Sequence, residues 1–170
     1  MGKDVIDLAG IELRRIIAES VTEKLPIVGT DGYFALMQQV ERIAEESGLS
    51  TESVRHLLNR YGSLISEILE LIKHNPKLAK PVTKNLPYLK AEIYYAVSHE
   101  GARSVDDVLS RRTRLAFEAP NSAMDLVDDV AAIIAPVLSW TAKQKKDSIN
   151  AYLDVAERES QSLEEALASA

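Results

Sequence analysis

The sequence has no cysteine, and its 170 residues include only seven glycines and six prolines. Without cysteine there is no disulfide, no thiolate ligand for a metal ion and no cysteine nucleophile. The scarcity of glycine and proline leaves few tight turns, which favours helices over strands. No apolar run approaches the roughly 20 residues that span a bilayer, and Met1 does not begin a secretory signal. We therefore expect a soluble protein.

Basic residues are also in deficit, since 26 acidic residues outnumber 20 basic ones and the net charge is −6. This balance disfavours binding to a phosphate backbone. Residues 43–58 nevertheless resemble a helix-turn-helix. The outward positions of its second helix begin with Thr51, Glu52 and Ser53 instead of cations, and Glu45 and Glu46 precede them. We therefore predict a packed helical hairpin here and no nucleic-acid partner.

Hydrophobic residues make up 46% of the chain, enough for a packed core. They recur at helical spacing, and no useful stretch alternates with period two. We predict an all-α domain of about eight helices, with no sheet and no internal repeat. The expected helices cover approximately residues 4–20, 33–47, 51–61, 64–72, 88–100, 105–112, 122–135 and 142–158, with a loop at 75–87.

Residues that begin or end helices give some of these boundaries. Gly48 occupies the position of a left-handed C-terminal cap, and Gly62 ends the following helix. Ser50 and Ser63 are expected to cap the helices that come after them.

Capping pairs and one proline mark the second half of the chain. Ser104 with Asp107 and Thr141 with Gln144 have the spacing of capping boxes. Pro136 lacks an amide proton, so we expect it to kink or divide the helix that contains it.

Motifs for cofactors and metals are missing. No Gly-x-Gly-x-x-Gly follows a strand, since Gly29 and Gly32 have the wrong spacing, and no phosphate-binding loop is present. His56, His74 and His99 fall on different helices or helix ends and form no zinc-binding pair. We expect no catalytic residue, no cofactor-binding residue and no metal ligand in this chain.

The densest group of charges lies between two neighbouring predicted helices. It consists of Glu92, Glu100, Asp107, Arg111, Arg112 and Arg114. The helical spacing turns Arg112 inward, and a buried guanidinium requires a carboxylate partner. We predict a structural charge network in which Glu92 or Glu100 pairs with Arg112. The alternative is a site where Arg111, Arg112 and Arg114 capture a phosphate.

Three segments resemble a known family. They are LPIVGTDGY at 25–33, HLLNRYGS at 56–63, and the pair AEIYYAVSHEGA at 91–102 with DDVLSRRTR at 106–114. Their order and spacing resemble the C-terminal helical domain of bacterial FAD-dependent glycerol-3-phosphate dehydrogenases and the related alpha-glycerophosphate oxidases. The resemblance covers about residues 25–152. Pro136 departs from the acidic or polar residue expected there.

The resemblance implies a parent enzyme that oxidises sn-glycerol 3-phosphate to dihydroxyacetone phosphate. FAD would pass the electrons to a membrane quinone, or to oxygen in the oxidases. Such enzymes are cytoplasmic and peripheral to the inner face of the bacterial membrane. Their FAD fingerprint, substrate residues and catalytic base belong to the N-terminal flavin domain. We therefore expect this chain to hold no FAD and to be inactive alone.

Domain boundaries follow from the same reading. Residues 1–28 would be a helical leader and linker from the end of the flavin domain, 29–158 the helical domain, and 159–170 a frayed tail. The expected partner is the flavin domain of the same protein. The alternative function is an independent helical interaction or regulatory module.

The first helix carries an apolar stripe that needs a partner. Its residues are Ile6, Leu13, Ile16 and Ile17. We expect this stripe to pack on the helical body, or to be buried against a second copy in a homo-oligomer.

Overall fold

A computed structural model describes residues 2–169 of the chain, so Met1 and Ala170, the outermost residues of the predicted leader and tail, lie outside it. The α-helices are α1 (Gly2–Glu12), α2 (Tyr33–Met37), α3 (Val40–Ser47), α4 (Thr51–Tyr61), α5 (Ile65–His74), α6 (Lys90–Ser98), α7 (Leu115–Glu118), α8 (Val127–Val137) and α9 (Ala142–Ala168). Shorter helical segments connect them: η1 (Thr22–Lys24), η2 (Gly62–Leu64), η3 (Pro76–Ala79), η4 (Asp107–Arg112) and η5 (Pro120–Leu126).

The all-α prediction is confirmed. Residues 2–169 form no strand. The segment predicted as a loop at 75–87 contains η3, and Pro81 forms an isolated antiparallel bridge with Leu89 just beyond it. Residues 2–169 form nine α-helices and not the expected eight, partly because the helix predicted at 33–47 breaks between Met37 and Val40. The apolar spacing continues across that break, so periodicity could not reveal it.

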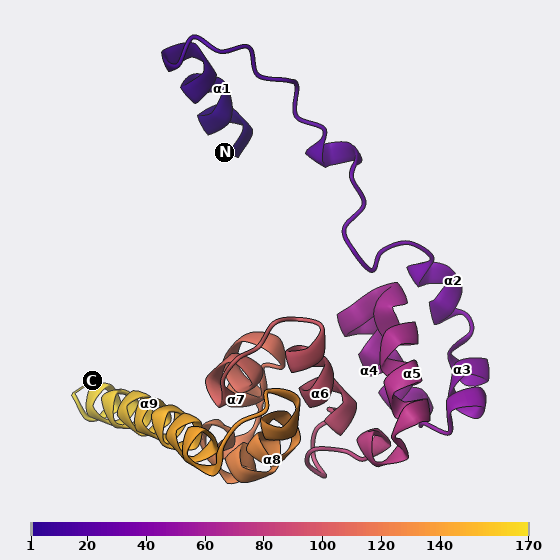
Figure 1. Cartoon of the computed structure of the whole chain (residues 1–170), viewed down its shortest axis with the longest axis vertical. Coiled ribbons are helices and arrows are strands. Elements are labelled where there is room, and N and C mark those ends of the chain that lie inside the picture. Colours follow the sequence, from indigo (N-terminus) through magenta and orange to yellow (C-terminus); the bar gives the residue numbers. More distant parts are fainter. Residues whose placement is uncertain (1, 170) are drawn as a thin grey trace.

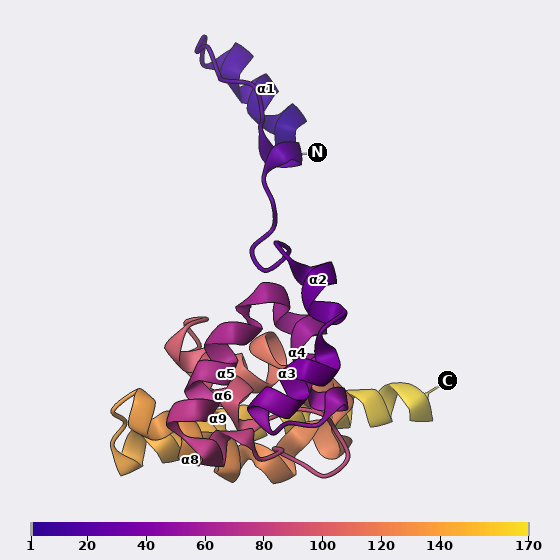
Figure 2. The same cartoon turned by 90° about the vertical axis from the view of Figure 1, so that its right-hand side faces the viewer.

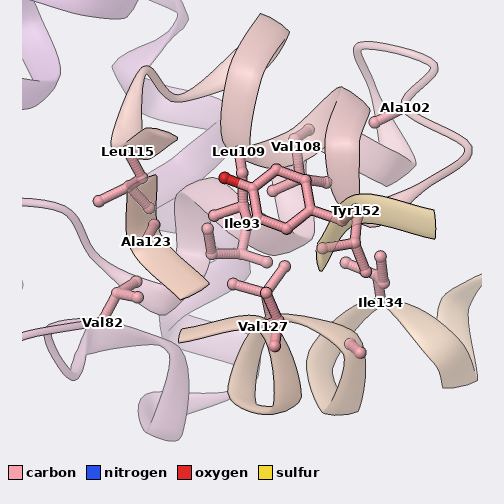
Figure 3. Packing of buried hydrophobic residues seen from close by; sticks show 14 of the residues in the cluster. Val82, Ile93, Ala102, Val108, Leu109, Leu115, Ala123, Val127, Ile134 and Tyr152 are labelled. Carbon is pink, nitrogen blue, oxygen red and sulfur yellow. The ribbon is translucent and has the colours of Figure 1, made fainter. Parts of the chain in front are cut away.

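Two hydrophobic cores divide the helical body. The first core lies among α3, α4, α5 and η3, and the second lies among η4, α7, η5, α8 and α9. Helix α6 contributes to both, with Ala91 and Tyr95 in the first core and Ile93 and Ala96 in the second. Figure 3 shows the second core, where Tyr152 of α9 lies among residues of several other elements.

Helix α1 and the following segment lead away from the helical body (Figures 1 and 2). The apolar stripe of Ile6, Leu13, Ile16 and Ile17 is exposed to solvent. The stripe therefore does not pack on the helical body, and the prediction of that contact is wrong. Burial against a second copy stays a prediction.

Helix α1 also ends at Glu12, well before the predicted end at Ser20. Arg14 adopts a left-handed conformation with φ 50°, which stops the helix. The chain then folds back, so that a Cβ placed on Gly10 would lie 2.7 Å from the Cδ1 atom of Ile17. Because Gly10 has no side chain, the side chain of Ile17 can pack against the last turn of α1.

Most helix ends in the first core are as predicted. Gly48 caps α3 with φ 72°, the Ser50 Oγ atom accepts the Ser53 N–H at 3.0 Å, and Gly62 ends α4. The prediction that Ser63 caps α5 is wrong, because η2 joins the two helices directly and Leu64 precedes α5. The Ser63 N–H instead donates to the Gly29 carbonyl at 2.8 Å.

A π-helix, η4, occupies most of the helix predicted at 105–112. The Ser104 hydroxyl accepts the Asp107 N–H at 3.0 Å, as the capping pair predicts. The Asp107 carboxylate accepts the Arg103 N–H at 3.0 Å, one residue earlier than a capping box requires. The wider π-helical turn alters which side chains share a face.

A left-handed turn follows Pro120. Asn121, Ser122 and Ala123 have φ values of 50°, 50° and 57°, so the helix predicted to open at Asn121 or Ser122 begins at Val127 instead. The Tyr152 hydroxyl donates to the Ser122 carbonyl and holds this turn. Pro136 lies in the last turn of α8, which ends one residue later.

The predicted capping box at the start of α9 is confirmed. The Thr141 hydroxyl accepts the Gln144 N–H at 3.3 Å, and the Gln144 side chain accepts the Thr141 N–H at 2.8 Å. The helix continues to Ala168, where a frayed tail was expected from residue 159, and its end projects from the body (Figures 1 and 2). Across residues 2–169, no helix has the length and apolarity needed to cross a membrane.

Candidate functional site

Glu92 is the fully buried charge around which the candidate site forms. It lies in the first turn of α6, its exposed fraction is 0%, and no other charged residue among 2–169 is buried. One carboxylate oxygen accepts the Leu89 N–H at 2.7 Å. This bond satisfies an amide at the helix start, where a negative charge is favoured.

Two residues of α4 face the same carboxylate. The Nε2 atom of His56 lies 3.0 Å from Oε1 of Glu92, and the Nε atom of Arg60 lies 3.4 Å from it. His56 and Arg60 are four residues apart, so they share one face of α4. The Glu92 carboxylate therefore joins α4 to α6.

Arg60 extends the site toward the second core. Its guanidinium donates to the Tyr88 hydroxyl at 3.3 Å and to the Arg112 carbonyl. The Tyr88 hydroxyl donates to a Glu118 carboxylate oxygen at 3.1 Å. Burial raises the pKa of Tyr88 to about 12. We call His56, Arg60, Tyr88, Glu92 and Glu118 the Glu92 cluster, which links α4, α6 and α7.

The predicted pairing of Arg112 with Glu92 or Glu100 is wrong. The Arg112 Nε atom donates to the backbone carbonyl of Glu100 at 3.0 Å, and no carboxylate of residues 2–169 forms an ion pair with it. Glu92 is already occupied by His56 and Arg60. The prediction assumed 3.6 residues per turn, whereas Arg112 ends a π-helix, so the expected face was not the real one.

Glu100 carries a carboxylate with an incomplete environment. Its Oε2 atom is buried and has no hydrogen-bond partner, as is also true of the Tyr61 hydroxyl. Burial raises the pKa of Glu100, although the nearby Arg112 charge works in the opposite direction. Its ionised form is therefore disfavoured in the folded protein.

The other predicted network residues lie near the surface. Arg111 pairs with Asp107 at 3.1 Å and also with Asp106. Partial burial opposes ionisation of Asp107, but hydrogen bonds from Arg103 and Ser104 outweigh it, so the pKa of its carboxyl is lowered.

Arg114 does not join the other two arginines in an anion site. Its guanidinium lies 3.8 Å from Glu118. Arg111 and Arg112 have separate partners on the protein. The structure therefore gives no support to the phosphate-capturing alternative.

The other two histidines are separate from this site. His74 lies 3.4 Å from Glu70 on the exposed face of α5, and the ring of His99 stacks on Tyr95 with centroids 4.5 Å apart. No group of three histidine, aspartate or glutamate residues in the described part of the chain could hold a metal ion.

The described residues also do not fit FAD. A dinucleotide pyrophosphate is usually held at a glycine-rich turn between a strand and a helix. Residues 2–169 form no strand from which such a turn could emerge. The candidate site is therefore the Glu92 cluster, a group of ion pairs and hydrogen bonds that holds α4, α6 and α7 together.

Sequence reasoning missed His56 and Arg60 as partners of Glu92. The available signal was their spacing of four residues beside the buried positions Leu57 and Tyr61. That spacing places His56 and Arg60 on one face of α4, but it does not indicate that α6 packs against that face.

Comparison with known proteins gives a consistent family. Residues 20–145 match the family of the C-terminal domain of alpha-glycerophosphate oxidase. Glycerol-3-phosphate dehydrogenase 2 of Mycobacterium tuberculosis (strain ATCC 25618 / H37Rv) is 42% identical over 159 residues, which cover 94% of this chain and 27% of that protein. Glycerol-3-phosphate dehydrogenase of Mycobacterium leprae is 43% identical over 152 residues, or 89% of this chain and 26% of that protein.

More distant matches have similar names. A probable mitochondrial glycerol-3-phosphate dehydrogenase of Dictyostelium discoideum is 29% identical over 129 residues, covering 76% of this chain and 20% of that protein. No solved structure matches the chain. The chain thus spans 27% or less of the length of these three relatives. None of these matches supports an independent interaction module.

Proposed function

The chain belongs to the family of the C-terminal domain of alpha-glycerophosphate oxidase, and from this premise we propose that it is the non-catalytic helical domain of an FAD-dependent glycerol-3-phosphate dehydrogenase. The observation that carries the proposal is the family match over residues 20–145. Identity of 42% with a glycerol-3-phosphate dehydrogenase across 94% of this chain supports it.

The parent enzyme would oxidise sn-glycerol 3-phosphate to dihydroxyacetone phosphate. FAD, bound by a separate flavin domain, would accept the electrons and pass them to a quinone. The parent would be cytoplasmic and peripheral to the inner face of a bacterial membrane. The names of the relatives support the substrate, while the acceptor and the location follow from the family resemblance.

This chain would contribute stability and an interdomain surface to the enzyme. The charged groups of the Glu92 cluster form ion pairs or hydrogen bonds with other side chains or with the backbone of the same chain. A cluster used in this way supports a structural role, because its groups are engaged in holding α4, α6 and α7 together. We therefore assign these charges a structural role and not a catalytic one.

Two preparations test this proposal. The 170-residue chain alone, mixed with FAD and sn-glycerol 3-phosphate, should bind no flavin and give no turnover. The parent protein should oxidise sn-glycerol 3-phosphate, and deleting residues 29–158 should lower its thermal stability and flavin content. Flavin binding by the isolated chain, or a parent protein unaffected by the deletion, would contradict the proposal.

A further inference from the structure

We propose that the surface around Gly29 and Gly62 is where the part of the parent protein that this chain does not span packs against the helical domain. This inference rests on the proposed function and specifies the partner surface. We call this surface the linker face, and it consists of Val28, Gly29, Tyr33, Phe34, Asn59 and Gly62.

A close backbone contact fixes the linker face. The Ser63 N–H donates to the Gly29 carbonyl at 2.8 Å. A Cβ placed on Gly62 would lie only 1.9 Å from the same carbonyl oxygen, and one on Gly29 would lie 2.6 Å from the Tyr61 carbonyl oxygen. The segment before α2 is therefore held directly against the end of α4.

The side chains beside this contact are also positioned. The Tyr33 hydroxyl donates to the Asn59 Oδ1 atom at 2.8 Å. The rings of Tyr33 and Phe34 meet edge to face, with centroids 5.3 Å apart. A hollow of about 350 Å³ lies here, lined by the residues of the linker face and also by Leu58. The linker face thus offers an ordered aromatic and apolar surface around a concavity.

The large apolar side chains of this surface are not covered by any part of residues 2–169. Phe34 is 81% exposed, Val28 is 79% exposed and the neighbouring Ile27 is 78% exposed. Twelve of the fifteen large exposed hydrophobic residues of the described chain lie between residues 5 and 34. Several large exposed apolar residues close together, as at Ile27, Val28 and Phe34, mark an interaction surface, whereas single exposed residues such as Phe117 do not.

The relatives indicate what covers it. The family match starts at residue 20, so the exposed apolar residues between 5 and 34 lie on both sides of the point where the matched domain begins. The chain spans only 27% of the mycobacterial relative, so most of a parent protein of that size lies elsewhere. A covalently connected partner has a high effective concentration at a surface beside the connection. This favours the rest of the parent over a second copy.

Hydrogen exchange tests the proposal by comparing the 170-residue chain with the same residues inside the parent protein. Amides in residues 28–34 and 58–63 should exchange at least about tenfold more slowly in the parent. Phe34→Asp in the parent should reverse this protection. Phe117→Asp is the matched control, because Phe117 is 70% exposed but lies outside the linker face.

Three results would overturn the inference. One is equal exchange of these amides in the chain and in the parent. Another is equal effects of Phe34→Asp and Phe117→Asp on protection. The third is a concentration-dependent dimer of the isolated chain, found by sedimentation and abolished by Phe34→Asp, which would assign the surface to a second copy.

Turnover of sn-glycerol 3-phosphate by the parent is measured separately. An active parent with an unprotected linker face refutes only the surface assignment. An inactive parent with a protected face refutes the proposed function and leaves the packing surface supported.

Discussion

Replacing Glu92 by alanine should be the most destabilising charge substitution in this chain. The side chain is fully buried and its carboxylate serves the Leu89 N–H at 2.7 Å, His56 at 3.0 Å and Arg60 at 3.4 Å. Removing it leaves a half-buried guanidinium without its carboxylate and a buried amide without an acceptor. Breaking a buried ion pair by removing one partner costs about 3–5 kcal/mol, because the remaining charge is left uncompensated.

Urea unfolding followed by circular dichroism at 222 nm measures this loss as a change in the free energy of unfolding. The control is Glu70→Ala, which removes an exposed carboxylate paired with Lys73 and His74 on α5. An exposed pair of this kind contributes about 0–1 kcal/mol.

A double variant separates the lost pair from the stranded charge. Glu92→Leu with Arg60→Leu should be less destabilised than Glu92→Leu alone, because the Arg60 guanidinium is then not left without its carboxylate. A loss for Glu92→Ala equal to that of Glu70→Ala would refute the reasoning. So would strict additivity of the Glu92→Leu and Arg60→Leu effects.

Three further predictions concern backbone geometry and pH. Gly62→Ala should lower the free energy of unfolding by about 2 kcal/mol more than Gly48→Ala. Gly48 has the left-handed helical conformation, with φ 72° and ψ 13°, whereas Gly62 has φ 57° and ψ −131° and also faces the Gly29 carbonyl. Equal losses in urea unfolding would contradict this reasoning. Glu100→Gln should raise the melting temperature at pH 7, because burial raises the pKa of Glu100 and so destabilises its charged form. This gain should shrink as the pH falls toward about 4, where the carboxyl of the original chain becomes protonated. A difference in melting temperature that stays constant from pH 7 to pH 4 would count against this reasoning. Tyr88 should ionise near its raised pKa of about 12, and its contribution to stability should be lost as the pH rises above about 10. Burial also raises the pKa of Tyr152 to about 12, so the late step of the absorbance titration at 295 nm should lose the amplitude of one tyrosine in Tyr88→Phe and should not disappear.

Helix ends were predictable wherever one residue acts locally. Gly48, Ser50 and Thr141 perform the capping roles that their side chains or backbone preferences indicate. Ser63 does not cap α5 because it lies inside η2, which runs directly into that helix, and its N–H donates to Gly29, far away in sequence. A contact of that range leaves no local pattern.

The charged site shows the same division between local and distant information. The sequence identified Glu92 as a member of a structural network, but it assigned the wrong arginine. The π-helix changes the direction of Arg112, and nothing in the spacing of residues 107–112 distinguishes it from an α-helix. The choice of His56 and Arg60 as partners depends on how α4 crosses α6, which tertiary packing determines.

Helix α6 packs into both cores, and this has a consequence for how the domain opens. One face of α6 supplies Tyr95 to the first core and another face supplies Ile93 to the second core. Each core otherwise has its own set of helices, and α6 is the helix that both share. Partial unfolding of either half would still leave α6 packed against the remaining half. Its amides should therefore become accessible only when both halves of the domain are unfolded at the same time.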